Sequence, residues 1–231
     1  MRFRAVFFDA GETLVHPHPS YPELFAEVLA REGHPRSAED VSAASRVVLH
    51  RFSEAARDNV LWTTSAERSR AFWTSVYDRM IESLDLPAGD GLADTLYRTF
   101  TDRSNYALFD DVRPALDALA RTGVLLGVVS NFEAWLEDLL ADLAVRERFA
   151  VRVISGSEGV EKPDPRIYAL ALERAGVEAA DAAYVGDNPE FDVDPPAALG
   201  MFPVLIDWRG RHGGFGGARV ADLRELPEVL A

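Results

Sequence analysis

The hydrophobic pattern of the chain changes character twice. Residues 5–8 form a short apolar run that ends at a carboxylate, which is typical of a strand buried on both faces. From 21 to 104, apolar residues recur every three or four positions, and this spacing predicts helices without a convincing strand. After Phe109, apolar runs alternate with helical segments to the end of the chain. This alternation predicts a parallel sheet with helices on both faces.

The pattern also predicts individual elements. Apolar helix faces are expected at Leu24–Val28–Leu29, at Val41–Ala44–Val47–Val48 and at Phe72–Val76–Met80–Leu84, and a fourth helix follows a break at 85–91. Later strands are expected within 123–131, 149–158, 182–188 and 202–207, and helices at 112–122, from 135, at 165–175, near 195–199 and at 220–230. We therefore predict an α/β fold, in which a doubly wound parallel core (1–15 and 105–231) is interrupted after its first strand by an all-helical segment (16–104).

Composition narrows the class of protein. The 231 residues are 48% hydrophobic and 27% charged, which is ordinary for a globular protein, and 24 basic against 38 acidic residues give a net charge of −14. An acidic surface repels nucleic acid and anionic membrane, so we expect neither as a partner. The chain has no cysteine, which excludes disulfides and thiolate chemistry. No signal-peptide pattern or long apolar run is visible, so we expect a cytoplasmic protein.

Polar residues follow four strands of the predicted core. They are Asp9, the pair Ser130 and Asn131, Lys162, and Asp187 with Asp192. The carboxyl ends of parallel strands converge at one edge of a sheet, so we expect these side chains to lie together. Asp9 and Asp187 could share a divalent ion, and oxygen ligands without sulfur or clustered histidine suit Mg²⁺. Each residue alone could be a helix cap or a solvated charge, but their joint occurrence favours a shared site.

Four segments carry a resemblance to a known family. "FFDAGETL", "VVSNF", "EKPDPRIY" and "VGDNPEFDVDPPAALGM" resemble motifs one to four of the haloacid dehalogenase-like (HAD) hydrolase superfamily. Residues 16–104 stand where that family places its helical C1 cap, so the resemblance covers almost the whole chain. It implies a HAD-like Rossmannoid core with an inserted C1 cap. The wording of the later motifs is most similar to the subgroup around haloacid dehalogenase-like hydrolase domain-containing protein three.

This resemblance implies a Mg²⁺-dependent hydrolase, a phosphatase acting on a small phosphorylated metabolite. In the family, the first motif's aspartate attacks phosphorus and becomes an aspartyl-phosphate, and Asp9 occupies that position. The ion would be held by Asp9, by the backbone carbonyl of Gly11 and by Asp187. Asp192 would join this metal site by positioning metal-bound water or Lys162.

The resemblance also implies a phosphate-binding set, which consists of Ser130, Asn131 and Lys162. Ser130 would hydrogen-bond the transferred phosphoryl group, and Lys162 would offset the charge on the nucleophile and the phosphate. Ser130 and Lys162 would therefore act with Asp9 in catalysis. Phosphoryl transfer depends mainly on positioning and charge stabilisation, so a metal and a lysine are sufficient attractors on an acidic protein.

The first motif departs from the phosphatase pattern, which is Asp-x-Asp-Gly-Thr. This chain has Gly11 where the second aspartate normally supplies acid–base catalysis, a contribution of ~10²–10⁴-fold. Glu12, His16 and His18 are possible replacements, although each is more simply explained as a turn or connector residue. Two hypotheses remain: a phosphatase with reduced or substrate-restricted turnover, and a catalytically weak phosphate- or metal-binding regulatory protein. The intact charged set favours the enzyme, and the sequence does not indicate an oligomeric state.

Related chemistries fit less well. Haloacid dehalogenases proper need no metal and lack an acid at the Asp187 position, and phosphonate-cleaving relatives use a cap lysine, whereas 16–104 contains none. Response-regulator receivers place their phosphorylated aspartate on a later strand.

Within the cap, 59–70 is a candidate lid that could present Trp62 and Arg68. The glycine-rich stretch "RGRHGGFGG" at 209–217 is expected to be an exposed loop.

Overall fold

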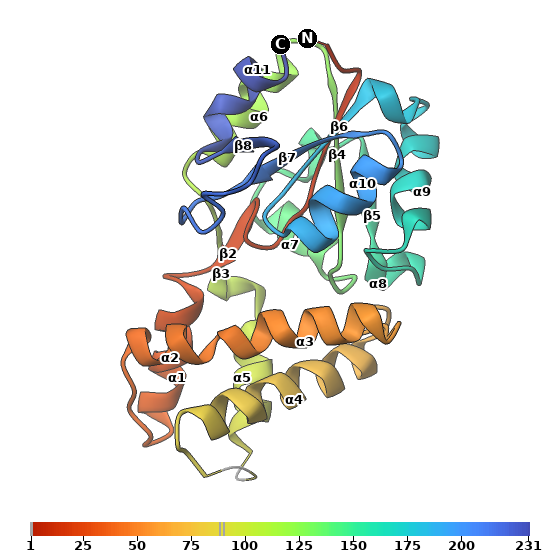
Figure 1. The fold of residues 1–231 in the computed structure, drawn as a ribbon. Helices are drawn as coiled ribbons and strands as arrows, with labels where there is room; N and C mark the ends of the chain where they lie inside the picture. The colour runs from red at the N-terminus through yellow and green to blue at the C-terminus, as the bar shows by residue number, and fades with distance from the viewer. Residues whose placement is uncertain (1, 88, 90) are drawn as a thin grey trace. The chain divides into compact units, whose positions relative to one another are not determined.

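A computed structural model describes residues 2–87, 89 and 91–231 of the chain. The chain divides into two compact units, one formed by 1–15 with 108–231 and the other by 16–107 (Figure 1). A two-stranded ribbon of β2 (Val15–Pro17) and β3 (Tyr106–Leu108) contains both points where the chain passes between the units. Sequence periodicity did not predict this ribbon, because strands of three residues are too short to show an alternating pattern.

The larger unit is built on a six-stranded parallel sheet in the order β5-β4-β1-β6-β7-β8 (Figure 1). The strands are β1 (Ala5–Phe8), β4 (Leu125–Ser130), β5 (Val151–Ile154), β6 (Ala182–Gly186), β7 (Phe202–Ile206) and β8 (Ala218–Val220). The strand that opens the chain is central, and later strands are added outward on both sides of it. This confirms the predicted doubly wound α/β fold.

Helices cover both faces of this sheet. They are α6 (Val112–Ala120), α7 (Leu136–Asp142), α8 (Ser155–Glu158), α9 (Pro165–Ala175), α10 (Asp194–Ala198) and α11 (Leu226–Val229). Figure 1 shows α9 and α10 on one face and α6 with α11 on the other. Right-handed crossovers require this arrangement, because the chain adds β4 and β5 on one side of β1 and then β6, β7 and β8 on the other side.

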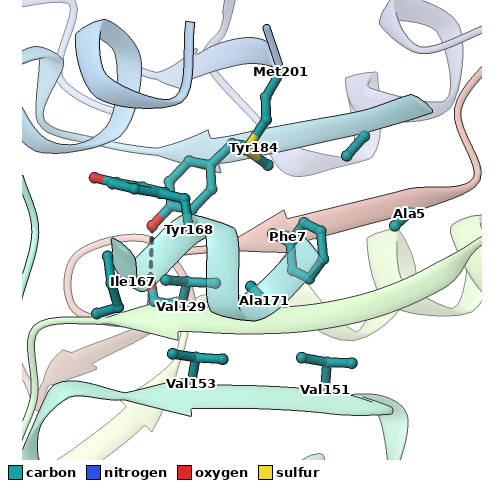
Figure 2. Packing of buried hydrophobic residues seen from close by; sticks show 11 residues of the cluster. Ala5, Phe7, Val129, Val151, Val153, Ile167, Tyr168, Ala171, Tyr184 and Met201 are labelled. Atoms are coloured by element: carbon teal, nitrogen blue, oxygen red, sulfur yellow. Dashed lines mark hydrogen bonds between the residues drawn. The ribbon is translucent and has the colours of Figure 1, made fainter. Parts of the chain in front are cut away.

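The core beneath α9 is a tightly packed cluster of apolar side chains (Figure 2). Phe7 from the central strand is fully buried there, and Ile167 and Ala171 of α9 pack over it. Phe7 lies in register with Gly127 of β4, where an added Cβ would lie 2.6 Å from the Phe7 ring. The glycine therefore provides the space that the phenylalanine ring occupies.

The smaller unit contains the helices α1 (Tyr21–Arg31), α2 (Ala38–Ala44), α3 (Arg46–Arg57), α4 (Ala66–Ser83) and α5 (Leu92–Phe100), followed by a short 3₁₀ turn, η1 (Arg103–Asn105). Three serines are the N-caps of α1, α2 and α4, and each accepts a backbone N–H from three residues further on; they are Ser20, Ser37 and Ser65.

The predicted break at 85–91 includes Ala88 and Asp90, which lie outside the described residues. Among the described residues, no helix combines the length and apolar character of a membrane span.

Two predicted helices were wrong in part. The single face expected at 41–48 is divided at Ser45 between α2 and α3, and Val47 and Val48 are only half-buried. The final helix expected at 220–230 is instead the end of β8, a 3₁₀ turn at Leu223–Glu225 and the short α11. Val220, Leu223, Leu226 and Leu230 are nevertheless buried, so apolar positions at helical spacing are occupied here by a strand, a turn and one helical turn.

Candidate functional site

The first candidate residue, Asp9, follows the central strand of the sheet directly. Its backbone N–H donates to the carbonyl of Val185 at 2.8 Å, which continues the pairing of β1 with β6. Its side chain is 10% exposed. Ser130, the last residue of the neighbouring β4, donates its hydroxyl to Oδ1 of Asp9 at 2.9 Å. The carboxyl ends of adjacent strands thus bring together two residues that are 121 positions apart in the sequence.

Lys162 enters the site from a loop between α8 and α9. Its backbone is held by the side chain of Asn131, which accepts the Lys162 N–H at 2.6 Å and donates to the Lys162 carbonyl at 2.8 Å. The start of the next helix, α9, is also fixed by a local contact, because Asp164 is its N-cap and accepts the backbone N–H of Arg166. The Asn131 amide, predicted to bind phosphate, is therefore placed to orient the lysine loop.

The ammonium of Lys162 has three partners within the chain. Nζ lies 2.7 Å from Oδ1 of Asp9, 2.6 Å from Oδ1 of Asp192 and 3.2 Å from the hydroxyl of Tyr184. Its side chain is 3% exposed. Burial alone would lower the pKa of Lys162, but the attraction of Asp192 and Asp9 outweighs burial and raises the pKa above its ordinary value.

Lys162 is also the only lysine of the chain, because the other 23 of its 24 basic residues are arginines (24 − 1 = 23). An ammonium is a compact charge with three donors, whereas a guanidinium is a planar fork that fits paired oxygens. Three partners around one nitrogen suit the ammonium. The one lysine of the chain therefore stands at a buried position where its geometry suits its partners.

Two further carboxylates, Asp187 and Asp192, lie beside Asp9. The three side chains offer oxygens that all lie within 4.8 Å of one another. Burial, together with repulsion from Asp192 and Asp9, raises the pKa of Asp187 well above its ordinary value. Burial also raises the pKa of Asp192 to about 6, although Lys162 opposes the shift. Three carboxylates against one ammonium leave the cluster with excess negative charge, and hard oxygen donors suit Mg²⁺.

The close approach of Asp192 depends on a glycine. A Cβ on Gly186 would lie 2.3 Å from Cγ of Asp192, so only glycine fits at the end of β6. The other oxygen of Asp192 accepts the backbone N–H of Asn188 at 3.0 Å. This contact lies where the chain leaves β6 and enters a π-helical turn at Pro189–Val193. Asp192 is thus positioned by the backbone of the fourth motif as well as by Lys162.

The turn after Asp9 has an unusual backbone. The N–H groups of Thr13, Leu14 and Val15 all donate to the carbonyl of Ala10. Glu12 has a φ of 55°, in the left-handed region that costs an ordinary L-residue about 1–2 kcal/mol. The family's pattern has glycine at this position, for which the conformation carries no such penalty.

Two residues beyond β7 contact Glu12. The indole Nε1 of Trp208 donates to the Glu12 carbonyl at 2.9 Å, and Nη2 of Arg209 lies 3.1 Å from Oε2 of Glu12. The Glu12 carboxylate, a possible substitute acid or base, is therefore paired with a guanidinium. Gly11 has space beside it, because an added Cβ would meet only Cε2 of Phe132 at 3.9 Å.

Other candidate residues belong to the helical unit. His16 Nδ1 lies 2.8 Å from the carbonyl of Pro17, and the rings of His16 and His18 are 6.2 Å apart. The suggestion that Trp62 is presented as a lid residue was wrong. Trp62 is 4% exposed and stacks on Phe52 and Phe72 inside its own unit. Arg68 is exposed and donates to the hydroxyl of Thr64.

Sequence reasoning missed Tyr184, which lies directly behind the site. Its hydroxyl accepts from Lys162 and donates to the carbonyl of Val129 at 2.6 Å, the contact drawn as a dashed line in Figure 2. Within the run "AAYVG", a tyrosine is indistinguishable from an ordinary core residue. The available signal was the hydroxyl of this tyrosine. Recognising that it faces Lys162 requires knowledge of the register of β6 in the sheet, which the sequence alone does not provide.

Comparison with known proteins gives a consistent picture. The sequence profile of the haloacid dehalogenase-like hydrolase family matches residues 3–200. Over 215 residues the chain is 30% identical to mouse (Mus musculus) haloacid dehalogenase-like hydrolase domain-containing protein 3, an alignment that covers 89% of this chain and 82% of the mouse protein. Over 132 residues it is 35% identical to a phosphoserine phosphatase of Thermus thermophilus, covering 55% of this chain and 53% of that protein.

Solved structures share the fold. The chain is similar to the crystal structure of an L-2-haloacid dehalogenase, with a TM-score of 0.74 and 25% sequence identity. The superposition covers 100% of this chain and 99% of the dehalogenase. Relatives named for phosphate chemistry and for dehalogenation thus share one architecture, and the side chains at the site must distinguish between them.

Proposed function

Because this chain belongs to the haloacid dehalogenase-like hydrolase family, we propose that it is a Mg²⁺-dependent phosphatase of small phosphorylated compounds, with Asp9 as the nucleophile. The observation that carries this proposal is the single lysine held between Asp9 and Asp192, with Asp187 beside them. A phosphatase relative, the phosphoserine phosphatase of Thermus thermophilus, supports the reaction class.

Asp9 has the geometry of a nucleophile. Ser130 and Lys162 both donate to Oδ1, and among the described residues we find no donor to Oδ2. Oδ2 is therefore the oxygen that attacks phosphorus, while the bond from phosphorus to the ester oxygen breaks. The leaving oxygen departs as an anion or takes a proton from water. In the second step, water attacks phosphorus, the bond to Asp9 breaks and inorganic phosphate is released with the proton passing to solvent.

Positive charge is what this reaction most needs from the protein. Asp9, Asp187 and the Gly11 carbonyl would hold Mg²⁺, which when bound offsets charge on the carboxylates and the phosphoryl oxygens. Lys162 neutralises Asp9 from the side of the protein core and would offset the charge of the transferred group, which Ser130 would contact. Asp192 and Asn131 hold Lys162 in place through its ammonium and its backbone.

The missing acid–base group restricts the substrate. Gly11 offers no proton to a leaving oxygen, and the Glu12 carboxylate is paired with Arg209. Alkyl phosphates leave as strongly basic alkoxides, so they should be poor substrates. Acyl and aryl phosphates leave as weaker bases and should react faster in the first step. The second step lacks its usual base for every substrate, so the aspartyl-phosphate should accumulate.

Two alternatives compete with this proposal. Dehalogenation is the activity for which one structural relative is named, but family members with that activity lack an acid at the Asp187 position, and here Asp187 stands beside Asp9. A binding or regulatory role with little turnover is favoured by Gly11 and by the pairing of Glu12. The retained charge-stabilising set favours the enzyme over this second candidate.

The test is turnover of acetyl phosphate, an aryl phosphate, a sugar phosphate and 2-chloropropionate by the full chain, with and without Mg²⁺. Asp9→Asn is the active-site variant, and Asp110→Asn, at an exposed carboxylate of the same unit, is the matched control. We expect Mg²⁺- and Asp9-dependent phosphate release, fastest from the activated esters. Chloride release without metal would establish a dehalogenase. No turnover above Asp9→Asn by a chain that binds Mg²⁺ would establish the binding protein.

A further inference from the structure

The glycine-rich stretch at 209–217 begins beside the turn that follows Asp9. We propose that Trp208 and Arg209 are positioning residues that fix the orientation of the Gly11 carbonyl by holding the backbone of Glu12. This inference rests on the proposed function, because it takes the Gly11 carbonyl as a metal ligand. It adds two residues that lie outside the four sequence motifs.

Backbone geometry links Glu12 to the carbonyl of Gly11. That carbonyl belongs to the planar peptide that joins Gly11 to Glu12, so it rotates only when the plane rotates. The φ angle of Glu12 is the torsion about the bond that follows the plane. Its value of 55° is rare for a glutamate, and persists only where surrounding contacts hold it.

Three contacts hold Glu12 in this conformation. Trp208 donates its indole N–H to the Glu12 carbonyl, and Arg209 pairs with the Glu12 carboxylate. The backbone N–H of Glu12 donates to the carbonyl of Val15 at 2.8 Å. Glu12 is thus held at its amide, its carbonyl and its side chain, and two of these three contacts come from the loop after β7.

The loop that supplies these contacts is itself anchored. Trp208 stacks on Phe109 with ring centroids 4.4 Å apart, so the indole is fixed in direction. Asp207 is 6% exposed and accepts the backbone N–H groups of Arg211 and His212. It also pairs with Arg219 of β8 at 2.9 Å. The start of the loop is therefore attached to the sheet rather than free in solvent.

These contacts explain why the chain tolerates glutamate where the family's pattern has glycine. A glycine adopts the left-handed conformation without help, whereas this glutamate needs partners. Each of the two residues has its own proposed role: Trp208 holds the Glu12 carbonyl, and Arg209 holds the Glu12 carboxylate. A merely structural loop would affect the stability of the protein but would leave its affinity for Mg²⁺ unchanged.

The experiment measures Mg²⁺ binding to the full chain by calorimetry, without substrate. Trp208→Phe keeps an aromatic ring that can stack on Phe109 and removes the indole N–H together with one ring of the indole. Loss of this one hydrogen bond is expected to weaken Mg²⁺ binding by about three- to tenfold. Trp73→Phe, in the helical unit, is the matched control and should leave the affinity unchanged. Thermal unfolding of each variant separates loss of fold from loss of positioning.

Arg209 is tested by a double-mutant cycle. Arg209→Gln should weaken Mg²⁺ binding by about twofold, which is the scale of an exposed ion pair. In a Glu12→Gln background the same change should have no effect, because its partner is already gone. Arg146→Gln removes the same charge from an exposed pair with Glu147 in the same unit and is the control.

The outcomes are distinct. Weaker Mg²⁺ binding in Trp208→Phe, with the control unchanged, supports the positioning role. Unchanged Mg²⁺ affinity in Trp208→Phe and Arg209→Gln, beside normal binding that Asp187→Asn abolishes, overturns this inference and leaves the proposed function standing. Absence of Mg²⁺ binding by the unmodified chain overturns both.

Discussion

Two groups of buried carboxylates in the α/β unit deal with their charge in different ways. At the carboxyl edge of the sheet, Asp9 and Asp192 share the ammonium of Lys162. At the start of α6, Asp111 is 2% exposed and accepts the backbone N–H of Leu223 at 2.6 Å. Burial, and then repulsion from Asp222, raises the pKa of Asp111 to about 6.

The partner of Asp111 shifts in the opposite direction. The hydrogen bond from Arg224 lowers the pKa of Asp222 to about 2, so Asp222 keeps its charge while Asp111 tends to take a proton. In the first group a buried ammonium faces both carboxylates, whereas in the second the cation, Arg224, pairs with Asp222 and leaves Asp111 without a cationic partner of its own. A site that must receive an anionic substrate needs the first arrangement, because positive charge can be shared with the substrate. The second arrangement only fastens the C-terminal segment to α6.

The largest expected effect comes from adding a further carboxylate to the group around Lys162. Gly11→Asp restores the acid–base group of the phosphatase pattern at a position with space for a Cβ. We expect turnover of a sugar phosphate to rise by ~10²–10⁴-fold, and turnover of acetyl phosphate to rise less. Steady-state phosphate release in saturating Mg²⁺ measures the change.

Gly11→Asn is the matched control, since it has the same size and cannot transfer the proton. An equal rise in Gly11→Asn would show that rigidity of the turn, and not acid–base chemistry, limits the native protein. No rise in Gly11→Asp, in a variant that still binds Mg²⁺, would contradict our interpretation of Gly11.

The next effect comes from removing the cation. Lys162→Met leaves the carboxylates of Asp9 and Asp192 buried without their partner, and breaking such a buried pair typically costs about 3–5 kcal/mol. We expect the free energy of unfolding, measured by urea denaturation in a metal chelator, to fall by about that amount. Added Mg²⁺ should restore part of the loss, because it supplies positive charge to the same carboxylates.

A second background tests the cause of this loss. In Asp192→Asn the lysine faces one carboxylate fewer, so the further change Lys162→Met should cost less than it does in the native chain. Equal losses in both backgrounds would mean that packing of the lysine stem, rather than charge, accounts for the stability. The exposed pair of Arg146 with Glu147 is a control, and its removal should change stability by less than ~1 kcal/mol.

The smallest effect concerns the group of Asp111 and Asp222 and depends on pH. A folded-state pKa of about 6, raised above the ordinary value of 3.8, makes protonated Asp111 stabilising below about pH 4. That contribution is lost as the pH rises from 4 through 6. Asp111→Asn removes the titration, so it should raise the free energy of unfolding by about 1 kcal/mol at pH 8, a value reduced by the opposite shift of Asp222.

Denaturation of both proteins at pH 4 and pH 8 checks this sign. The gain should be present at pH 8 and absent at pH 4. Asp110→Asn, at the neighbouring exposed position, is measured alongside as the control. A gain of equal size at both pH values would show that Asp111 is destabilising for a reason other than its charge.

The fold was largely predictable because its signals are local. The apolar runs before Asp9, Ser130 and Asp187 identified three strands, and the parallel topology then required their ends to meet. β8 escaped prediction because it has only three residues, and its last residue, Val220, has the spacing of a helix face with Leu223 and Leu226. The division at Ser45 escaped because an amphipathic pattern does not show where one helix ends and the next begins.

The site was predictable only in part, because several of its contacts have no local signal. Trp208 and Glu12 are 196 positions apart, and neither belongs to a pattern that suggests the other. Asp111 and the N–H of Leu223 are 112 positions apart. The role of Asn131 also depends on tertiary placement, since its amide could cap a helix, bind an anion or orient a loop. The position of Asn131 at the end of β4, within hydrogen-bond distance of the Lys162 backbone, favours the role of orienting this loop.

Asp9 is proposed to accept a phosphoryl group, and this covalent step can be observed directly. The experiment is to mix the full chain with acetyl phosphate and Mg²⁺, quench in acid, and locate phosphate by mass spectrometry of the peptides. We predict one phosphate on the peptide that contains Asp9, removed by hydroxylamine and absent in Asp9→Asn. Acetyl phosphate hydrolysis at an unchanged rate in Asp9→Asn, or phosphate on a different residue, would contradict the proposed role of Asp9.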